Sequence, residues 1–369
     1  MEDVVLVSAC RTPIGSFMGG LSSFSAPRLG ALVVEESIRR AGINKSDVQE
    51  VIMGNVLTAG EGQAPARQAA IFAGLPESVE CMTINKVCGS GLKAVMLAAQ
   101  AIRLGDADTI VAGGMESMSN VPFAVEKARS GLRLGNSELV DLMIKDGLWD
   151  VYNDFHMGSA AELCARECAV PREAQDEFSI QSYKRAQEAT SKGLFKDEIL
   201  PVIITSKEGE QIVDKDEDPF KTNFEKIPKL KPVFQKDGTV TAANSSKIND
   251  GAAALVVMSR KKAETLKLKP LARIIASASA AKKPEWFTTA PVDVIAKVLE
   301  RAGLKKEDID LFEINEAFAV VALAVNKMLG LDPEKVNVHG GAVAMGHPIG
   351  ASGARILVTL LHALKHRGK

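Results

Sequence analysis

The sequence contains few of the residues that mark specialised classes of protein. Its 369 residues include 5 cysteines, 2 tryptophans and 2 tyrosines. A small, odd number of scattered cysteines argues against a disulfide framework, so we expect reduced thiols. The 45 basic and 46 acidic residues leave a net charge of -1. This balance gives no general attraction to nucleic acid or to an anionic membrane, and we expect neither as a partner.

Long apolar runs and leader segments are also lacking. The longest uncharged apolar runs, such as residues 252–258, are far too short to span a bilayer. The N-terminus leads directly into a predicted strand at residues 4–8, with no basic and apolar leader before it. We therefore expect no transit peptide in this sequence and no encoded compartment.

Short β-branched runs alternate with amphipathic helical segments, which predicts an α/β protein with a mostly parallel sheet. The chain is longer than a protein with a single hydrophobic core usually is, which suggests two domains or a duplicated unit. Residues 41–48 return as residues 302–309, and residues 89–93 return as residues 351–355, at offsets of 261 and 262. This repeat predicts two similar βαβαβ halves.

The repeat also predicts where elements lie. Each copy of its first segment leads into a predicted strand, at residues 51–54 and 311–314. A predicted helix at residues 90–104 precedes a strand at 109–114, whereas the matching helix ends at residues 366–369. The second half is therefore expected to lack its final strands.

The region between the two halves has no counterpart in the repeat and is predicted to be an inserted lid. It is rich in charge and turns, with a predicted helix at residues 171–191 and a loop at 215–226. We divide the chain into a first half, a lid or loop domain with a return into the first half to about residue 262, and a second half, at residues 1–119, 120–240 and 263–369.

Cys88 lies directly before a glycine-flanked turn that opens the predicted helix at residues 90–104. The free N–H groups and positive dipole end of that helix favour a thiolate. Gly89 and Gly91 allow an acyl group or another backbone to approach closely. A free cysteine more often packs as a small apolar side chain, but the position at a helix start favours a nucleophile.

His347 is the only titratable side chain in a glycine-dense segment, residues 340–353. It is a candidate general base, although a histidine in a turn is often only a structural hydrogen-bonding group. Because the repeat makes the two glycine turns pseudo-symmetric partners, we expect His347 to lie near Cys88. Asn315, between a predicted strand and helix, either caps the helix or positions a water molecule.

Together these segments resemble the thiolase family, and in particular its acetoacetyl-CoA thiolases (acetyl-CoA acetyltransferases) of animal mitochondria. The resemblance covers essentially the whole chain and rests on residues 8–15, 113–119 and 346–348. It implies a thiolase fold with α/β/α/β/α layers. It also implies reversible condensation of two acetyl-CoA molecules into acetoacetyl-CoA and free CoA.

The resemblance also implies roles for individual residues. Cys88 would be acetylated, His347 would activate it and bind the thioester oxygen, and Asn315 would hold the water of an oxyanion hole. The implied coenzyme A contacts are the covering loop His156 and Met157, with Tyr183, Lys221, Thr222, Asn223, Lys226 and Ser246. No organic cofactor is implied, but a potassium ion is, beside Tyr183, Ala242, Ala243, Ser245 and Val343.

The sequence departs from the family pattern near its end. The resemblance implies a second cysteine about two dozen positions beyond the helix that follows His347, but the last cysteine here is Cys168. That group would remove the α-proton of the second acetyl-CoA, and a positioned base contributes about 10²–10⁴-fold. We expect acylation of Cys88 without it but weak condensation, and we interpret the sequence as a shortened thiolase.

Two alternatives stay open at this point: a broader 3-ketoacyl-CoA thiolase of β-oxidation, and a truncated acyl-CoA-binding paralogue without full catalysis. The resemblance further implies a homotetramer built as a dimer of dimers, with residues 55–68 near the dimer contact. It implies the mitochondrial matrix as the compartment, with the cytoplasm as the alternative.

Overall fold

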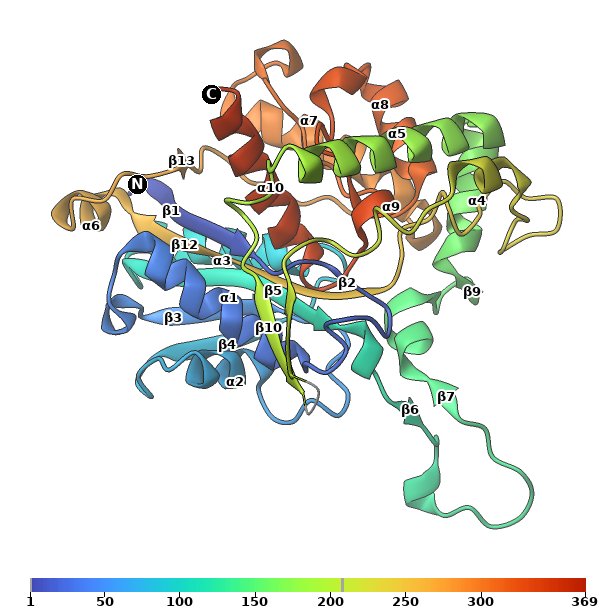
Figure 1. Cartoon of the computed structure of the whole chain (residues 1–369), viewed down its shortest axis with the longest axis horizontal. Helices are drawn as coiled ribbons and strands as arrows, with labels where there is room; N and C mark the ends of the chain where they lie inside the picture. The colour runs from blue at the N-terminus through green and yellow to red at the C-terminus, as the bar shows by residue number, and fades with distance from the viewer. Residues whose placement is uncertain (1, 207–208) are drawn as a thin grey trace.

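A seven-stranded sheet forms the core of the computed structural model, which describes residues 2–206 and 209–369. The strand order is β13-β1-β12-β5-β3-β4, and β2 pairs with β12 (Figure 1). The strands are β1 (Val4–Arg11), β2 (Gly15–Ser16), β3 (Glu50–Gly54), β4 (Glu80–Ile84), β5 (Thr109–Ser117), β12 (Asn249–Ser259) and β13 (Ala272–Arg273). Strands β1, β5 and β12 are buried along their whole length, because both faces of the sheet are covered.

The sheet is mixed, so the prediction of a mostly parallel sheet was wrong. Strand β3 pairs in parallel with β4 and with β5. Strand β12 pairs antiparallel with both β1 and β5. The physical reason is that β12 returns from the lid and enters the sheet between two first-half strands, running opposite to both.

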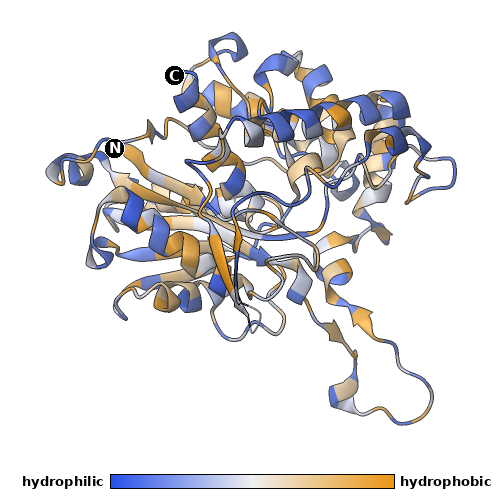
Figure 2. Cartoon of the chain, viewed as in Figure 1, coloured by the Kyte–Doolittle hydropathy of each residue, from blue (hydrophilic) through white to orange (hydrophobic). Residues whose placement is uncertain are grey.

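Helices cover the two faces of this sheet. Helices α1 (Ala26–Ala41) and α2 (Pro65–Phe72) pack on one face, while α3 (Ser90–Leu104) and α10 (Ser352–His366) pack on the other. Figure 2 shows apolar residues concentrated on the strands, with hydrophilic residues on the outer helix surfaces. The bounds of α3 confirm the predicted helix at residues 90–104.

The helices α3 and α10 meet at matching glycines. A Cβ atom on Gly91 would lie 2.6 Å from the amide nitrogen of Ala354, and one on Gly353 would lie 2.5 Å from the amide nitrogen of Leu92. Real Cβ atoms are not found this close to backbone atoms. This reciprocal contact joins the two halves around an approximate two-fold axis, as the sequence repeat predicts.

The second half is mainly helical among the residues that the structure describes. It contains α7 (Ala290–Ala302), α8 (Ala319–Leu329), α9 (Ala342–Met345) and α10. The predicted strand at residues 311–314 was wrong in extent, because only Phe312 forms an isolated parallel bridge, to Val336. An extended segment with one bridge lacks the ladder of hydrogen bonds that defines a strand.

The region between β5 and β12 contains a helical hairpin and several short strand pairs. Its elements are β6 (Phe123–Ala124), β7 (Val140–Asp141), β8 (Trp149–Asp150), β9 (Phe155–His156), α4 (Met157–Glu167), α5 (Arg172–Ser191), β10 (Val202–Ser206) and β11 (Gly209–Val213), and α6 (Arg260–Thr265) follows β12. Helix α5 confirms the predicted helix at residues 171–191. The β6–β7 pair forms an arm that projects from the molecule (Figure 1). The division at residues 119, 240 and 262 stays a prediction.

A buried ion pair network fastens this lid to the sheet. The Arg11 guanidinium of β1 binds Glu198 through Nε at 2.6 Å and Asp216 through Nη1 at 2.6 Å, and all three side chains are buried. Breaking a buried network of this kind leaves an uncompensated charge, which destabilises by about 3–5 kcal/mol. The lid is therefore held in a defined position over the sheet.

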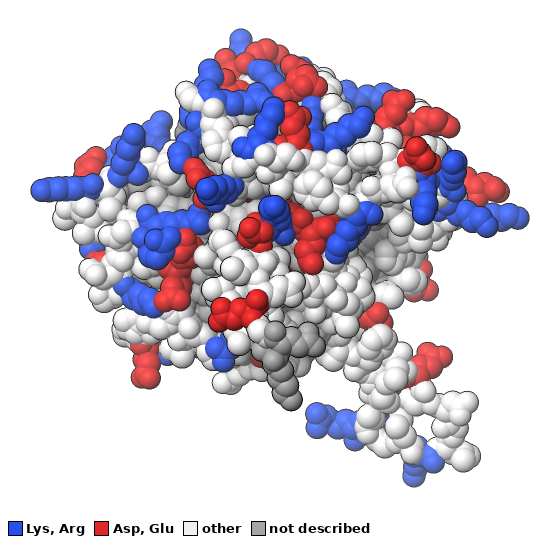
Figure 3. Space-filling model, in the orientation of Figure 1, with Lys and Arg blue, Asp and Glu red and all other residues white. Residues whose placement is uncertain are grey.

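The outer surface carries both signs of charge. Figure 3 shows lysine and arginine interspersed with aspartate and glutamate over the visible face, in line with a net charge of -1. By length and composition, the stretch 87–104 is apolar enough to cross a membrane, although it includes Lys93 and Arg103 and is not an uncharged run. Helix α3 within it packs on the sheet and on α10, and a buried core helix passes the same test.

Candidate active site

Cys88 lies in a tight turn between β4 and α3. The turn is closed by Ser90, whose hydroxyl donates to the Val87 carbonyl at 2.7 Å and accepts from the Lys86 amide at 2.8 Å. Val87 has φ 48°, a left-handed conformation that is strained for a β-branched residue. Strain of this kind persists only where the surrounding structure enforces it, and it often marks a functional site.

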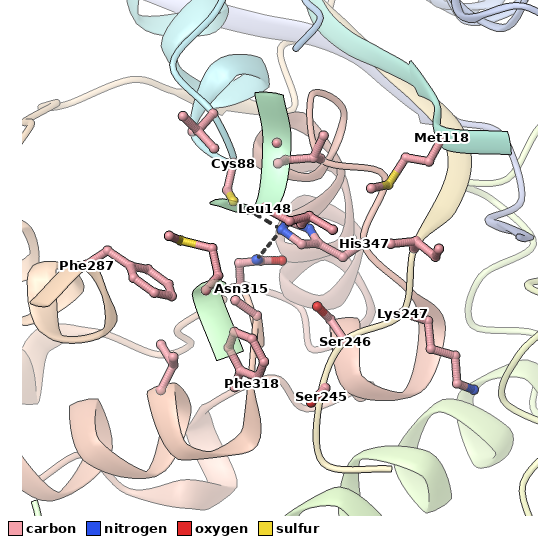
Figure 4. A pocket seen from close by; sticks show the side chains of 18 of the residues that line it. Cys88, Met118, Leu148, Ser245, Ser246, Lys247, Phe287, Asn315, Phe318 and His347 are labelled. Atoms are coloured by element: carbon pink, nitrogen blue, oxygen red, sulfur yellow. Dashed lines mark hydrogen bonds between the residues drawn. The ribbon is translucent and has the colours of Figure 1, made fainter. Parts of the chain in front are cut away.

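His347 comes from the turn between α9 and α10, and its ring points at the sulfur (Figure 4). Its Nε2 atom lies 3.2 Å from Cys88 Sγ. Its Nδ1 atom lies 2.5 Å from Ser352 Oγ, and the Ser352 hydroxyl donates to the Pro348 carbonyl at 2.9 Å. The Ser352 oxygen therefore accepts from Nδ1–H, which leaves the Nε2 lone pair facing the thiol.

The buried environment keeps this pair neutral at rest. Burial raises the pKa of Cys88 to about 11, and the charge of Glu116 adds to the increase. Burial lowers the pKa of His347 to about 4, with a further contribution from Arg355. The prediction of a thiolate at the helix start was therefore wrong, because burial raises the pKa of the thiol. The thiol needs His347 as a base at the moment of attack.

Asn315 points toward the same histidine (Figure 4). Its Nδ2 atom is 3.5 Å from His347 Nε2, and its Oδ1 atom is buried without a hydrogen-bond partner among the described residues. The residue at the start of α8 is Phe318, so Asn315 does not cap that helix. A buried amide oxygen without a partner suits a water molecule or a ligand donor.

A cavity of about 1080 Å³ opens onto Cys88, His347 and Asn315. Its wall is mainly apolar. The apolar part includes Met118, Met143, Leu148, Met157, Phe234, Phe287, Phe318 and Ile349. An apolar wall lowers the local dielectric constant, so charge that develops beside it interacts strongly with nearby donors.

Comparison with known proteins places this site in a family. The family description "Thiolase, N-terminal domain" matches residues 4–261, and "Thiolase, C-terminal domain" matches residues 268–369. The chain belongs to the thiolase family. It is 55% identical to the mitochondrial acetyl-CoA acetyltransferase of Rattus norvegicus over 99% of this chain and 86% of the rat protein. It is also 55% identical to the acetyl-CoA acetyltransferase of Cupriavidus necator, over 100% of this chain and 94% of the bacterial protein.

A solved thiolase has the same fold. The Acat5 thiolase of Ascaris suum, determined in complex with coenzyme A, has a TM-score of 0.95 and 47% sequence identity, covering 98% of this chain and 94% of that one. This likeness confirms the thiolase fold expected from the sequence. Within the described residues, the second half nevertheless shows only isolated bridges, such as that of Phe312 with Val336, in place of a second β layer.

Four of the predicted coenzyme A contacts of this thiolase line the cavity. They are His156, Met157, Lys221 and Ser246. His156 accepts from the Gly158 amide at 3.0 Å and stacks on Phe234 with ring centroids 4.8 Å apart, which fixes the start of α4. The Lys221 ammonium donates to Ser16 Oγ at 2.6 Å, at the cavity wall.

The other predicted contacts lie off the cavity wall. Tyr183 is buried in α5, where its ring meets Phe224 edge to face. Thr222, Asn223 and Lys226 belong to the adjoining lid segment, in which Asn223 Oδ1 accepts from the Glu225 amide at 3.0 Å and caps a short helix. Their roles in binding stay predictions.

The predicted potassium ligands form two groups. Ala242 and Ser245 line the cavity next to the buried Ala243, while Val343 lies in α9 and Tyr183 in α5. Carbonyl oxygens in general suit hard cations. A positive charge is already present nearby, because the Lys247 ammonium lies 5.2 Å from the Tyr183 ring centroid and 3.9 Å from Asp218 Oδ1.

Three further residues shape the thiolase site and were not among the predicted site residues. Ser352 orients His347, Asn249 Oδ1 accepts from the His347 amide at 3.0 Å, and Glu116 contacts the same turn at Gly350. The repeat pairs Ser352 with Ser90, so it could have pointed to Ser352. The contacts of Asn249 and Glu116 with this turn could not be predicted from the sequence, because they depend on how strands β12 and β5 pack against the second half.

Proposed function

We propose that this thiolase catalyses the reversible condensation of two acetyl-CoA molecules to acetoacetyl-CoA and CoA through an acetyl-Cys88 intermediate. The observation that carries the proposal is the neutral Cys88–His347 pair, 3.2 Å apart, on the wall of a large cavity. Support comes from the relatives, which are named acetyl-CoA acetyltransferases. The substrates are CoA thioesters, and we propose CoA as the released product.

The described residues account for the first step. Cys88 Sγ attacks the thioester carbonyl of acetyl-CoA while its proton moves to His347 Nε2. The C–S bond to CoA then breaks, and the departing CoA sulfur takes the proton from His347. Negative charge develops on the carbonyl oxygen in between, and Asn315, acting through a water molecule, is the nearest candidate donor. One fixed donor of this kind contributes about 3–4 kcal/mol.

The second step needs a base that removes the α-proton of a second acetyl-CoA. Among the described residues, Cys88 is the only cysteine that lines the cavity. The two steps should therefore be measured separately. Purified protein is incubated with radiolabelled acetyl-CoA, and labelled Cys88 and labelled acetoacetyl-CoA are quantified against a Cys88→Ser control.

Each result of this experiment has a defined meaning. Label on Cys88 together with acetoacetyl-CoA supports the proposed function. Label without product limits the chain to acylation. No label in the wild type would overturn the proposal and favour the acyl-CoA-binding alternative. Cleavage of a C4 3-ketoacyl-CoA is then compared with that of longer substrates, since equal rates would favour the broader β-oxidation thiolase.

We further propose that the protein is a homotetramer, assembled as a dimer of dimers. The strand β4 is an edge of the sheet with partly exposed residues, and the nearby Ile71, Phe72, Met82 and Val87 are exposed apolar side chains. An unprotected apolar edge strand pairs readily with another chain. Pairing of β4 with its copy would bury this edge and bring residues 55–68 toward the dimer contact.

The projecting arm is the proposed contact between dimers. Phe123, Leu132, Leu134 and Leu139 expose more than half of their surface on it, and Figure 3 shows much of its surface uncharged. Light scattering after size-exclusion chromatography tests this assignment. Leu134→Asp should give dimers, whereas a monomeric wild type would overturn both contacts.

The compartment and the ion are further parts of the proposal. We propose the mitochondrial matrix, supported by the rat relative whose name includes that organelle; the bacterial relative keeps the cytoplasm as the alternative. Imaging of the tagged full-length gene product distinguishes the two. The predicted potassium position has Ala242 and Ser245 on the cavity wall, but the Lys247 ammonium beside Tyr183 already supplies a positive charge there. We propose that Lys247 takes the place of the ion.

A further inference from the structure

Glu116 is a fully buried carboxylate at the end of β5. Its Oε1 atom accepts from Asn55 Nδ2 at 2.8 Å and from the Leu57 amide at 3.1 Å. Its Oε2 atom accepts from the Val56 amide at 3.0 Å and from the Gly350 amide at 2.8 Å. One side chain thus joins three segments: β5, the loop at residues 55–57, and the turn that carries His347.

These contacts require a carboxylate. All four partners are neutral N–H donors, and among the described residues no lysine, arginine or histidine pairs with Glu116. A glutamine of the same size carries one acceptor and one NH₂ group. In either orientation its NH₂ would face at least one backbone N–H group and leave it without a partner.

The contact with Gly350 is tightly packed. A Cβ atom on Gly350 would lie 2.6 Å from Glu116 Oε2, and one on Gly114 would lie 2.1 Å from the Gly350 carbonyl oxygen. The turn at residues 346–350 therefore rests directly on β5 and follows any movement of the carboxylate. Gly350 is three residues from His347, so this contact controls where the imidazole lies.

We propose that Glu116 is a positioning residue that holds the His347 turn of the second half against the Cys88 turn of the first half. The proposal deepens the proposed function and rests on it, because it assigns a role in the same acyl transfer. Glu116 does not touch the reacting atoms. It acts through Gly350 and the backbone of the turn.

If Glu116 acted only through its negative charge, its removal would change the rate of Cys88 alkylation in the opposite direction. The negative charge of Glu116 raises the pKa of the Cys88 thiol and so disfavours the thiolate. Removing this charge without moving His347 would therefore speed the reaction of Cys88 with an electrophile. Loosening the His347 turn would slow the same reaction, because the base would leave its place 3.2 Å from the sulfur. The direction of the change distinguishes the two roles.

The test measures alkylation of Cys88 by iodoacetamide at pH 7.5 in Glu116→Gln, with site-specific detection by mass spectrometry. We expect the rate to fall by about tenfold or more, since small displacements of a catalytic group have effects of this size. We expect kcat for acetyl transfer to fall in parallel while the KM for acetyl-CoA stays within about twofold. A folded variant with an unchanged or faster alkylation rate would overturn the proposal.

Glu162→Gln is the matched control. Glu162 is also a buried carboxylate held by neutral donors, namely the Thr239 amide and hydroxyl and the Val240 amide, but it lies in α4. This variant should destabilise the protein to a similar extent without slowing alkylation of Cys88. Equal slowing in both variants would mean that Glu116 has only a structural role.

If Glu116→Gln does not fold, a second variant tests the proposal. Gly350→Ala keeps the carboxylate but places a methyl group against Glu116 Oε2. Like Glu116→Gln, this variant should slow the alkylation of Cys88. A normal alkylation rate in folded Gly350→Ala would overturn the proposal. Alkylation does not require acetyl-CoA, so a wild type that alkylates normally but forms no acetyl enzyme would refute the proposed function and not the role of Glu116.

Discussion

Two turns with the same position in the repeat carry opposite chemical roles. Each precedes a helix of 15 residues, α3 in the first half and α10 in the second. Each has a serine at the first helical position, Ser90 or Ser352, whose hydroxyl donates to a carbonyl three or four residues earlier. The first turn presents the proton donor Cys88, and the second presents the acceptor His347.

The difference lies in what the serine does next. Ser90 accepts from a backbone amide and only closes its own turn. Ser352 contacts the Nδ1 atom of His347 and so orients a base. The duplicated scaffold therefore supplies two equivalent helix starts, of which one carries a nucleophile and the other its base. Each half contains only part of the site.

The largest effect is expected from removing the nucleophile of the first turn. Cys88→Ser should lower the rate of acetyl transfer by about 10⁴-fold or more, because a hydroxyl is a far weaker nucleophile than a thiol. Exchange of radiolabelled CoA into acetyl-CoA measures this rate. Appreciable exchange in Cys88→Ser would show that another group accepts the acetyl unit, and the comparison of the two turns would fail.

Removing the base of the second turn should have the next largest effect. His347→Ala is expected to lower kcat by about 10²–10⁴-fold, since the Cys88 thiol then loses the acceptor of its proton. The same exchange assay applies. Far-UV circular dichroism checks that the variant is folded. If exchange survived with less than a tenfold loss, His347 would be structural and the two turns would not act as a pair.

The pKa values give the third prediction. The Cys88 pKa is raised to about 11, so alkylation of the free enzyme, assisted by His347 near neutral pH, should rise further between pH 9 and pH 11 as the thiolate forms. The His347 pKa is lowered to about 4, so the base stays neutral at pH 5.5, where an ordinary histidine is mostly protonated. Acetylation of Cys88 should therefore show no acid limb near pH 6.5. A rate that does not rise between pH 9 and pH 11 would instead indicate a thiolate that is already formed at lower pH.

Much of the first half could be predicted from the sequence, because its signals are local. Apolar β-branched runs and glycine turns define β1, α3 and β5, and the repeat aligned Cys88 with the His347 segment before their distance was known. The mixed sheet could not be predicted in this way. The direction in which β12 enters depends on how the long lid returns, and no local pattern within residues 249–259 records it.

The protonation states of Cys88 and His347 could not be predicted from the sequence either. A cysteine at a helix start predicts a thiolate, but the desolvation that reverses this comes from cavity walls contributed by distant segments. Glu116 illustrates the same limit. Its motif, residues 113–119, supported the family resemblance, whereas its contact with Gly350 joins residues 234 positions apart in the sequence.

The two serines allow a direct test of the difference between the turns. Ser352→Ala should lower kcat by about tenfold, because the His347 ring loses the partner that fixes its tautomer and orientation. Ser90→Ala should change kcat less, by about threefold, since it loosens a turn without changing a base. Both variants lose buried hydrogen bonds, so the free energy of unfolding of each should fall by about 1–3 kcal/mol. Urea denaturation measures this change. Equal effects on kcat would remove the proposed distinction.

The smallest effect is expected at the cation position beside the lid. If the Lys247 ammonium supplies the positive charge against Tyr183, replacing potassium chloride by choline chloride should change the KM for acetyl-CoA by no more than about twofold. A cation near an aromatic ring contributes about 0.5–1 kcal/mol at exposed sites. Lys247→Met should therefore gain a potassium dependence of about twofold to fivefold. Strong, saturable activation of the wild type by potassium would show instead that the backbone oxygens of residues 242–245 bind the ion beside Lys247.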